Sequence, residues 1–267
     1  MQASVVISYY KNLPNLALIL QALNQQTARG KFEAIVSEDD DAAETVEFLH
    51  KWKKTAHFTI LHVSHADKGF RKCKILNEAV KAANSELLIF IDGDCIPHPQ
   101  FVHEYLSNQQ PGRVMYGRRA MLSEKISQQL WSDNNLSVLH PRNLFATGCK
   151  RAEEALYLPF VPQKFKTKLK DRLLGCNMGI NKKELLRING FDEDYTAAGA
   201  GEDSDIEWRL EALKDVTFYS MKFQAIVYHL YHPLRFTPAM EEKNYEILQR
   251  KIEDGFFACK NGLQKIP

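Results

Sequence analysis

The chain has 267 residues, 45% of them hydrophobic and 25% charged, as expected for a soluble globular protein with room for one large domain. Its 35 Lys and Arg residues nearly balance its 33 Asp and Glu residues, so the charge gives no support for nucleic-acid binding. The five cysteines are widely spaced and form no CxxC pair, which argues against zinc ribbons and disulfide frameworks and fits a reducing cytoplasm.

Short apolar segments alternate with amphipathic segments through the first 107 residues. Strands are expected at residues 4–10, 32–37, 58–63 and 87–91, and helices at residues 13–26, 42–54, 73–84 and 99–107. This alternation predicts βαβ units and therefore a mostly parallel central sheet flanked by helices.

The alternation loosens beyond residue 110. A strand is expected at residues 113–118, and residues 123–172 show no clean alternation, which predicts a small irregular subregion. Regularity returns at residues 175–180 and in helices at residues 182–188 and 203–214. Late strands are expected at residues 216–219 and 224–228, and a C-terminal helix at residues 244–257. The start of the sequence has no signal-peptide pattern, and no apolar run approaches the ~18 residues that span a bilayer.

The most informative stretch is the expected strand at residues 87–91, which ends in Asp92, Gly93 and Asp94. In open α/β sheets, ligands bind at the carboxyl ends of the strands, where this acidic step would lie. Two carboxylates there suit a divalent cation that also holds a diphosphate. Considered alone, the same residues are explained as well by an ordinary acidic turn.

Two further acidic clusters flank predicted elements. Residues 38–41 (EDDD) follow the second strand, where a carboxylate can accept hydrogen bonds from a base or a ribose, although a solvated loop or a helix cap is the commoner explanation. Residues 199–205 (GAGEDSD) place Glu202, Asp203 and Asp205 at a helix start. Carboxylates are stabilised there with or without a chemical role, and the purely structural explanation is strongest for Asp205.

Two histidines, His229 and His232, follow a late predicted strand. Imidazole together with the Asp94 carboxylate suits manganese, whereas a lone histidine is more often a buried hydrogen-bonding group. Cys95 is expected to be an inert small hydrophobe rather than a nucleophile. The sequence contains no GxxxxGK[ST], GxGxxG or GxSxG motif, so P-loop, dinucleotide-cofactor and serine-hydrolase functions lack support.

Taken in order, these segments resemble the GT-A glycosyltransferases of family 2. SVVISYYKN is similar to the family's opening strand and loop, IVSEDDD to its second acidic strand end, and KGFRKCKILNEAVKAANSELLIFIDGDCIPHPQFV to the segment around its DxD motif. GCNMGINKKELLRINGFDEDYTAAGAGEDSDIEWRL resembles the half shared with galactosyltransferases and chondroitin-type polymerases. The resemblance covers residues 1–120 and 174–232.

The resemblance implies a role for each matching residue. Nucleotide-sugar contacts would come from Ser8, Tyr9, Tyr10, Glu38, Asp39, Arg71, Lys72, Asp92 and Gly93. Mn²⁺, or Mg²⁺ in its place, would be held by Asp94, His229 and Asp92, with His232 as the alternative histidine ligand. Asp203 would be the catalytic base, and Glu202 would bind the sugar or the acceptor.

The implied protein is one GT-A domain over residues 1–267, with a nucleotide-sugar-binding half at 1–120 and an acceptor-binding half at 121–267. It would be an inverting transferase that moves a sugar, from UDP by preference, to a glycan or lipid-linked acceptor in surface polysaccharide or lipopolysaccharide synthesis. It would work in the cytoplasm with at most peripheral contact to the inner face of the membrane. A nucleotidyltransferase-like enzyme and an inactive glycan-binding module on the same fold are the alternatives, and the sequence leaves the sugar, the acceptor and the oligomeric state open.

Two departures from the family pattern concern the nucleobase pocket: SYY replaces PTY in the first strand, and Glu-Asp replaces Asp-Asp after the second. Residues 121–173 match no family segment and are expected to determine acceptor specificity. Within them, the lysines of residues 164–172 (KFKTKLKDR) alternate as on a strand and would share one face. That face would either bind an anionic glycan or lipid head groups or be simply solvated.

Overall fold

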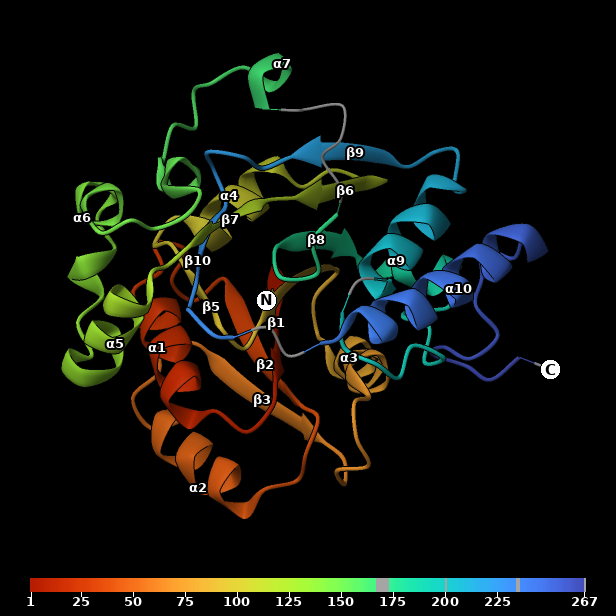
Figure 1. The fold of residues 1–267 in the computed structure, drawn as a ribbon, viewed down its shortest axis with the longest axis horizontal. Helices are drawn as coiled ribbons and strands as arrows, with labels where there is room; N and C mark the ends of the chain where they lie inside the picture. Colours follow the sequence, from red (N-terminus) through yellow and green to blue (C-terminus); the bar gives the residue numbers. More distant parts are fainter. Residues whose placement is uncertain (167–172, 200, 234–235, 267) are drawn as a thin grey trace.

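A seven-stranded sheet with the order β3-β2-β1-β4-β8-β6-β9 forms the centre of the protein, accompanied by a three-stranded sheet, β5-β10-β7 (Figure 1). The structure is a computed structural model that describes residues 1–166, 173–199, 201–233 and 236–266. In the large sheet, all neighbouring strands are parallel except where β8 runs antiparallel to β4 and to β6. The predicted α/β fold with a mostly parallel sheet is confirmed.

The elements follow one another closely along the chain. The strands are β1 (Ala3–Tyr9), β2 (Phe32–Glu38), β3 (Thr59–Ser64), β4 (Leu87–Asp92), β5 (Cys95–Pro97), β6 (Arg113–Tyr116), β7 (Arg118–Met121), β8 (Met178–Asn181), β9 (Thr217–Ser220) and β10 (Ile226–His229). The α-helices are α1 (Leu13–Asn24), α2 (Ala43–Trp52), α3 (Lys72–Ala82), α4 (Phe101–Asn108), α5 (Glu124–Asp133), α6 (Pro141–Ala146), α7 (Gln163–Lys166), α8 (Lys182–Arg187), α9 (Glu202–Glu211) and α10 (Pro238–Asp254). Two short 3₁₀ helices are η1 (Leu136–Leu139) and η2 (Ala152–Ala155).

Burial on both faces explains why the central strands are so apolar. Val5 and Ile7 of β1 face the core layer that contains α1, whereas Val6 between them faces the layer that contains α3. The strand therefore needs apolar residues at successive positions rather than at alternate ones. This property makes β1, β2 and β4 recognisable in the sequence.

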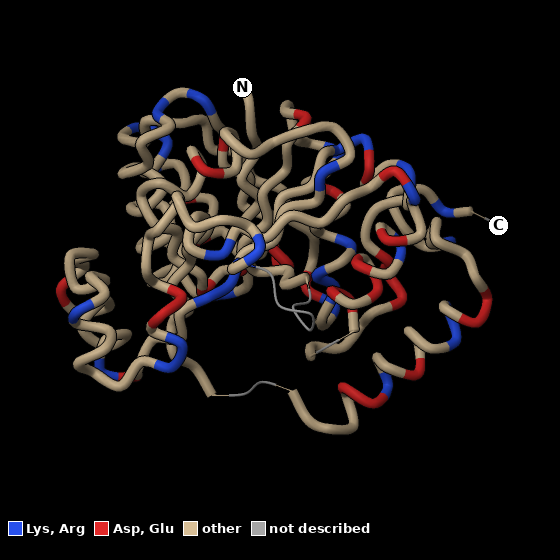
Figure 2. Tube along the Cα trace, turned by 90° about the horizontal axis from the view of Figure 1, so that it is seen from above, with Lys and Arg blue, Asp and Glu red and all other residues tan. Residues whose placement is uncertain are grey.

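The helix ends carry ordinary stop and start signals. The C-terminal helix α10, predicted from residue 244, begins at Pro238, where the Thr237 side chain accepts a hydrogen bond from Met240 N. It ends at Gly255, whose left-handed backbone (φ 70°) favours glycine. No helix within the described ranges combines the length and apolar composition needed to cross a bilayer. Figure 2 shows acidic and basic residues interspersed along the trace rather than separated onto two faces.

The three-stranded sheet differs from the prediction. The single strand expected at 113–118 divides at Gly117 into β6, which joins the large sheet, and β7, which joins the small one. Gly117 packs against Asn177 so closely that a Cβ would lie 2.1 Å from its side-chain nitrogen. The three-residue strand β5 was not predicted, because so short a segment has no visible periodicity.

Short helices fill the subregion that was expected to be irregular, and α5 and α6 lie together at the left of Figure 1. The predicted strand-like lysine face is wrong where it is described, since Lys164 and Lys166 lie in helix α7. Lys166 is buried, and its Nζ lies 2.5 Å from Gln224 Oε1, so it does not share an exposed face with Lys164. Residues 167–172 of that prediction lie outside the described residues.

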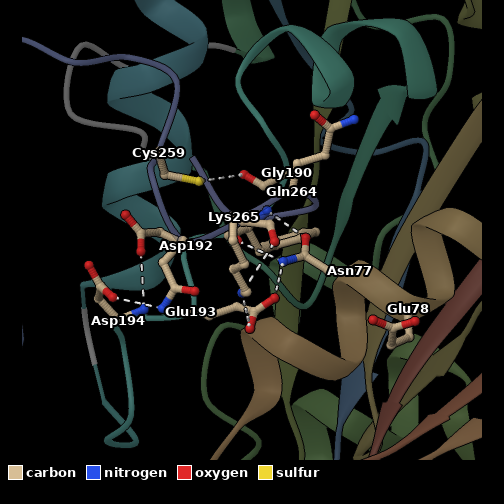
Figure 3. A network of polar contacts seen from close by, with 12 residues as sticks. Asn77, Glu78, Gly190, Asp192, Glu193, Asp194, Cys259, Gln264 and Lys265 are labelled. Carbon is tan, nitrogen blue, oxygen red and sulfur yellow. Dashed lines mark hydrogen bonds and ion pairs between the residues drawn. The ribbon is translucent and has the colours of Figure 1, made fainter. Parts of the chain in front are cut away.

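Polar contacts fasten the C-terminal segment to the α3 side of the sheet (Figure 3). Asn77 of α3 donates to Glu193 Oε1 at 3.1 Å, and Lys265 reaches Glu193 Oε2 at 2.6 Å. Lys251 of α10 lies 2.6 Å from Asp192 Oδ2 and 2.7 Å from Asp194 Oδ2. These contacts hold α10 next to α9, the helix that carries the third acidic cluster.

We expect Asn177→Ala to destabilise the fold by roughly 2–4 kcal/mol. Asn177 Nδ2 donates to Arg118 O and Ala225 O at 2.8 Å each, and its Oδ1 accepts from Tyr105 at 2.7 Å. The substitution would leave these buried groups unpaired where the two sheets meet. Urea denaturation measures the loss, with the exposed Gln128→Ala as control, and equal stability of the two variants would contradict this role of Asn177.

Candidate active site

The carboxyl end of β4 lies against that of β1, which brings the first acidic step close to the opening strand. Ser8 and Asp92 are partners in the parallel register. A Cβ at position 93 would lie 2.7 Å from Ser8 O, so Gly93 allows a close approach that other residues would obstruct. The chain then turns directly into β5, with Asp94 between the two strands.

Antiparallel pairing of β10 with β5 completes a group of candidate metal ligands. His229 is the partner of Cys95, and Leu230 N donates to Asp94 O at 2.9 Å. His229 Nε2 lies 3.6 Å from Asp94 Oδ1, and His232 Nε2 lies 3.1 Å from Asp94 Oδ2. One ligand atom from each of the three residues lies within 4.8 Å of the others, a spacing that suits a shared cation.

The protonation of these groups also suits a cation. His232 Nδ1 lies 2.8 Å from Pro233 O, and a carbonyl can only accept, so Nδ1 carries a proton and Nε2 is the nitrogen available as a ligand. Burial lowers the pKa of His229 against the opposing charge of Asp94, which favours the neutral imidazole. Burial alone would raise the pKa of Asp94, but the contacts with His232 and His229 outweigh it and hold the pKa at about 2.

A second acidic group gathers around Lys72 at the start of α3. Its Nζ lies 3.0 Å from Asp92 Oδ1 and 3.7 Å from Glu202 Oε1. Burial would lower the pKa of Lys72, but Asp92, Glu202 and Asp203 together raise it well above its ordinary value. Lys72 therefore remains charged and links Asp92, at the end of β4, to Glu202, at the start of α9.

The carboxylate of Asp203 is held by the backbone of the segment before β8. Gly175 N donates to Asp203 Oδ2 at 2.8 Å, and a Cβ on Gly175 would lie 2.3 Å from Asp203 Oδ1. Burial raises the pKa of Asp203, whereas Lys72 and this backbone N–H lower it. Burial and the neighbouring Asp203 raise the pKa of Glu202 to about 7. These two carboxyl groups are thus shifted towards the range in which they can exchange protons near neutrality.

Asp205, two residues further along α9, has a structural role. It is 1% exposed, and its Oδ2 accepts from Arg209 Nε at 2.8 Å and lies 2.6 Å from Arg209 Nη2 in an ion pair. Arg209 also donates to Ile188 O and Gly190 O, which ties α9 to the segment after α8. This arrangement agrees with the structural explanation that the sequence favoured for Asp205.

The two acidic residues at the end of β2, Glu38 and Asp39, have different surroundings. Asp39 Oδ1 lies 2.6 Å from His65 Nε2, and its Oδ2 accepts from Arg71 N at 2.8 Å, so it lies beside the loop before α3. Glu38 is fully buried, and its two oxygens are engaged by Thr45 at 2.6 Å and His62 at 2.7 Å. The structure therefore places Asp39 with the other predicted nucleotide-binding residues and Glu38 inside the β2–β3–α2 packing.

The two tyrosines at the end of β1, Tyr9 and Tyr10, also differ in their exposure. Tyr9 is buried in the core, and desolvation raises the pKa of its hydroxyl to about 12. Tyr10 is exposed, and its hydroxyl contacts Asp67 at 3.1 Å. Lys11 follows with a left-handed backbone (φ 46°), and its Nζ lies 2.6 Å from Asp67. Tyr10 rather than Tyr9 thus offers a surface to a ligand at this strand end.

Several residues of this region carry no signal in the sequence. His65 and Asp67 lie in a loop without periodicity, and Arg119 lies on the unpredicted strand β7. None of these residues belongs to a recognisable motif, so only the folded chain brings them to the site. Burial raises the pKa of Cys95 well above its ordinary value, in agreement with an inert thiol.

We expect Glu202→Gln to flatten the pH dependence of stability in the metal-free protein. Because the folded-state pKa of about 7 exceeds the ordinary 4.5, Glu202 destabilises the folded state progressively as the pH rises through this interval. The effect is of order 1–3 kcal/mol and is absent from the glutamine variant. Urea denaturation at pH 5 and pH 8 tests this, with the exposed Glu47→Gln as control. Parallel pH profiles for Glu202→Gln and the native chain would contradict it.

Comparison with known proteins matches two family models to this chain. The model described as "Glycosyl transferase family 2" matches residues 4–181, and "N-terminal domain of galactosyltransferase" matches residues 160–233. Chondroitin synthase of Escherichia coli is 23% identical over 265 residues, which cover 85% of this chain and 34% of that protein. Hyaluronan synthase of Pasteurella multocida is 22% identical over 78% of this chain and 22% of its own length. The chain thus spans about a third or less of these two relatives.

Solved structures share the fold at low sequence identity. A mannosyltransferase from Pyrobaculum calidifontis in complex with GDP-Man and Mn²⁺ superposes with a TM-score of 0.62 at 16% identity, covering 95% of this chain and 64% of that one. S. aureus TarS 1-349 in complex with UDP-GlcNAc gives a TM-score of 0.61 at 16% identity, covering 94% and 65% of the two chains. Both are glycosyltransferases of the GT-A type, so the predicted fold is confirmed.

Proposed function

Because this chain belongs to glycosyl transferase family 2, we propose that it is an inverting, metal-dependent glycosyltransferase that moves a sugar from UDP to a hydroxyl of a glycan or lipid-linked acceptor. The observation that carries the proposal is a cation group, Asp94 with His229 and His232, linked through Asp92 and Lys72 to the buried start of α9 at Glu202 and Asp203. A nucleotide-sugar requires both a positive centre for its diphosphate and a base for the acceptor.

The donor half of the site is supported by the types of ligand present. One carboxylate and two imidazoles fit Mn²⁺ better than Mg²⁺, which prefers oxygen ligands. When bound, the ion supplies positive charge that stabilises the diphosphate leaving group. Asp92 and Ser8 lie on adjacent strand ends, where they would contact the ribose, and Asp39 and Tyr10 would border the base.

The acceptor half depends on Asp203. Its Oδ2 is held by Gly175 N, and the geometry leaves Oδ1 to accept the proton of an acceptor hydroxyl. That hydroxyl would attack the anomeric carbon from the side opposite the diphosphate, which inverts the configuration in one displacement. Glu202, whose pKa is about 7, would hold a sugar or acceptor hydroxyl beside it.

The names of similar proteins support the substrate class. TarS was solved with UDP-GlcNAc and GalNAc-T7 with UDP, GalNAc and Mn²⁺, whereas the Pyrobaculum enzyme holds GDP-Man. Chondroitin synthase and hyaluronan synthase make polysaccharides, which favours a polysaccharide acceptor for this chain. An inactive glycan-binding module would not need the two shifted carboxyl groups of α9, and its distinguishing property would be the absence of metal-dependent nucleotide binding.

We expect UDP to bind the purified chain with micromolar affinity in the presence of Mn²⁺ and at least tenfold more weakly in EDTA, as measured by calorimetry. Asp94→Ala should abolish the metal-dependent part, because it removes the shared carboxylate of the cation group. Asp133→Ala, an exposed change on α5, is the control. Native protein that binds neither UDP, GDP nor dTDP with metal present would refute the donor site.

We expect Asp203→Asn to lower turnover by about 10²–10⁴-fold while UDP binding stays within twofold of the native value. The amide keeps the size of the side chain but cannot take a proton from the acceptor. Donor hydrolysis and transfer assays measure the first effect, and calorimetry measures the second. If Asp203→Asn weakened UDP binding as much as Asp94→Ala does, the assignment of Asp203 as the base rather than as part of the donor site would be contradicted.

A further inference from the structure

We propose that Arg119 binds an oxyanion of the donor substrate: a phosphate oxygen of the nucleoside diphosphate or, where the sugar is a uronic acid, its carboxylate. The inference rests on the proposed function and assigns a substrate contact to a strand that no sequence motif marks. It is carried by the position of Arg119, by its weak protein partner and by the charges that surround it.

Strand pairing in the small sheet places Arg119 on the same face as His229 of the cation group. Strand β7 is parallel to β10, with Arg119 opposite Val227 and Met121 opposite His229. Because side chains alternate along a strand and register partners share a face, Arg119 and His229 project from the same face of this sheet. Cys95 is the antiparallel partner of His229 and lies on that face as well.

Arg119 has only one hydrogen-bonding partner among the described residues, the thiol of Cys176, which lies 3.5 Å from its Nη1. A thiol is a weak acceptor, and a guanidinium has five N–H donors. No carboxylate of the described chain lies within 4.0 Å of it. Most of its hydrogen-bonding capacity is therefore available to a ligand.

Arginines with structural roles in this protein look different. Arg209 is paired with Asp205 and donates to two carbonyls, and Arg113 stacks 4.4 Å over the Tyr219 ring while donating to Asn108 O. Arg119 is largely buried without such a set of partners. Burying a cation is costly unless an anion is supplied, and a ligand would supply one.

The charges around Arg119 come from both halves of the site. Burial would lower its pKa, yet neighbouring groups, the Asp92 carboxylate among them, hold it above its ordinary value, so it stays a cation. Asp203 and His229 also lie within its electrostatic reach. The Arg119 side chain is therefore within electrostatic reach of a candidate metal ligand and of the proposed base, the two groups that a bound donor would lie beside.

The charges of the site favour an anion-binding role for Arg119. Among the described residues, the site gathers the carboxylates of Asp92, Asp94, Glu202 and Asp203 near the cationic side chains of Lys72 and Arg119. Lys72 is already engaged by Asp92 and Glu202. A diphosphate or a uronate entering this acidic site needs a further donor fork, and a planar guanidinium matches both oxyanions.

The test is calorimetric titration of UDP, UDP-glucose and UDP-glucuronate, with Mn²⁺, into the full native chain and its Arg119→Gln and Arg119→Lys variants. We expect Arg119→Gln to weaken binding about tenfold or more and Arg119→Lys to weaken it less, because lysine keeps the charge but not the fork. Arg187→Gln, which removes a surface guanidinium paired with Asp215, should leave all three affinities unchanged.

The pattern across ligands identifies the oxyanion. Equal weakening for all three ligands assigns the phosphate, and weakening confined to UDP-glucuronate assigns the carboxylate. Native-like affinity of Arg119→Gln for all three ligands overturns the inference and leaves the proposed function intact. Failure of the native chain itself to bind any of them overturns both. If the glutamine variant does not fold, Arg119→Lys decides, since weaker binding at an unchanged melting temperature supports the contact and native binding refutes it.

Discussion

The antiparallel pairing of β10 with β5 is the interaction on which the candidate site depends. It brings His229 beside Asp94 although the two residues are far apart in the sequence, and it is fixed by backbone hydrogen bonds such as Leu230 N to Asp94 O at 2.9 Å. A shift of this register by one residue would turn His229 to the opposite face of the small sheet. Asn177 holds the same sheet in place by donating to the carbonyls of Arg118, the first residue of β7, and Ala225, the residue before β10. The geometry of the cation group thus comes from sheet pairing and not from its own side chains.

The second constraint is the concentration of negative charge at the start of α9. Glu202 and Asp203 are favoured at a helix N-terminus, but burial next to Asp92 opposes their ionisation. Lys72 and the Gly175 N–H compensate only part of this cost. Binding of a cation and a donor as proposed would therefore stabilise the protein, in keeping with the common trade-off between stability and function. The close fit of Gly175 against Asp203 also means that a backbone contact orients the proposed base.

Much of the fold could be predicted because the large sheet is buried on both faces. Strands β1, β2 and β4 each contain successive apolar residues, at positions 5–7, 34–36 and 87–91, and the carboxylates Asp92 and Asp94 mark a strand end without further information. Strands β5 and β7 could not be found, since the first has three residues and the second is separated from β6 only by Gly117. Arg119 was missed for that reason. The error at Lys166 has another cause: an alternating pattern fits an exposed strand, but a buried contact with Gln224 gives the same lysine a place in a helix. Local patterns do not contain such long-range contacts.

The small sheet also bears on how the domain is organised. Strands β5 and β7 come from the first 121 residues, whereas β10 comes from the last third of the chain, so Asp94 belongs to one predicted half and both histidines to the other. The same holds for the acidic group, where Lys72 and Asp92 from the first half meet Glu202 from the second. A donor held by these groups would touch residues of both halves at once. Its binding would therefore stabilise the pairing of β10 with β5, and any disturbance of that pairing would weaken the cation site and the contact through Lys72 together. Under the proposed function, donor binding and acceptor activation would be coupled, because the small sheet joins Asp94 to the histidines and Lys72 joins Asp92 to Glu202 at the start of α9.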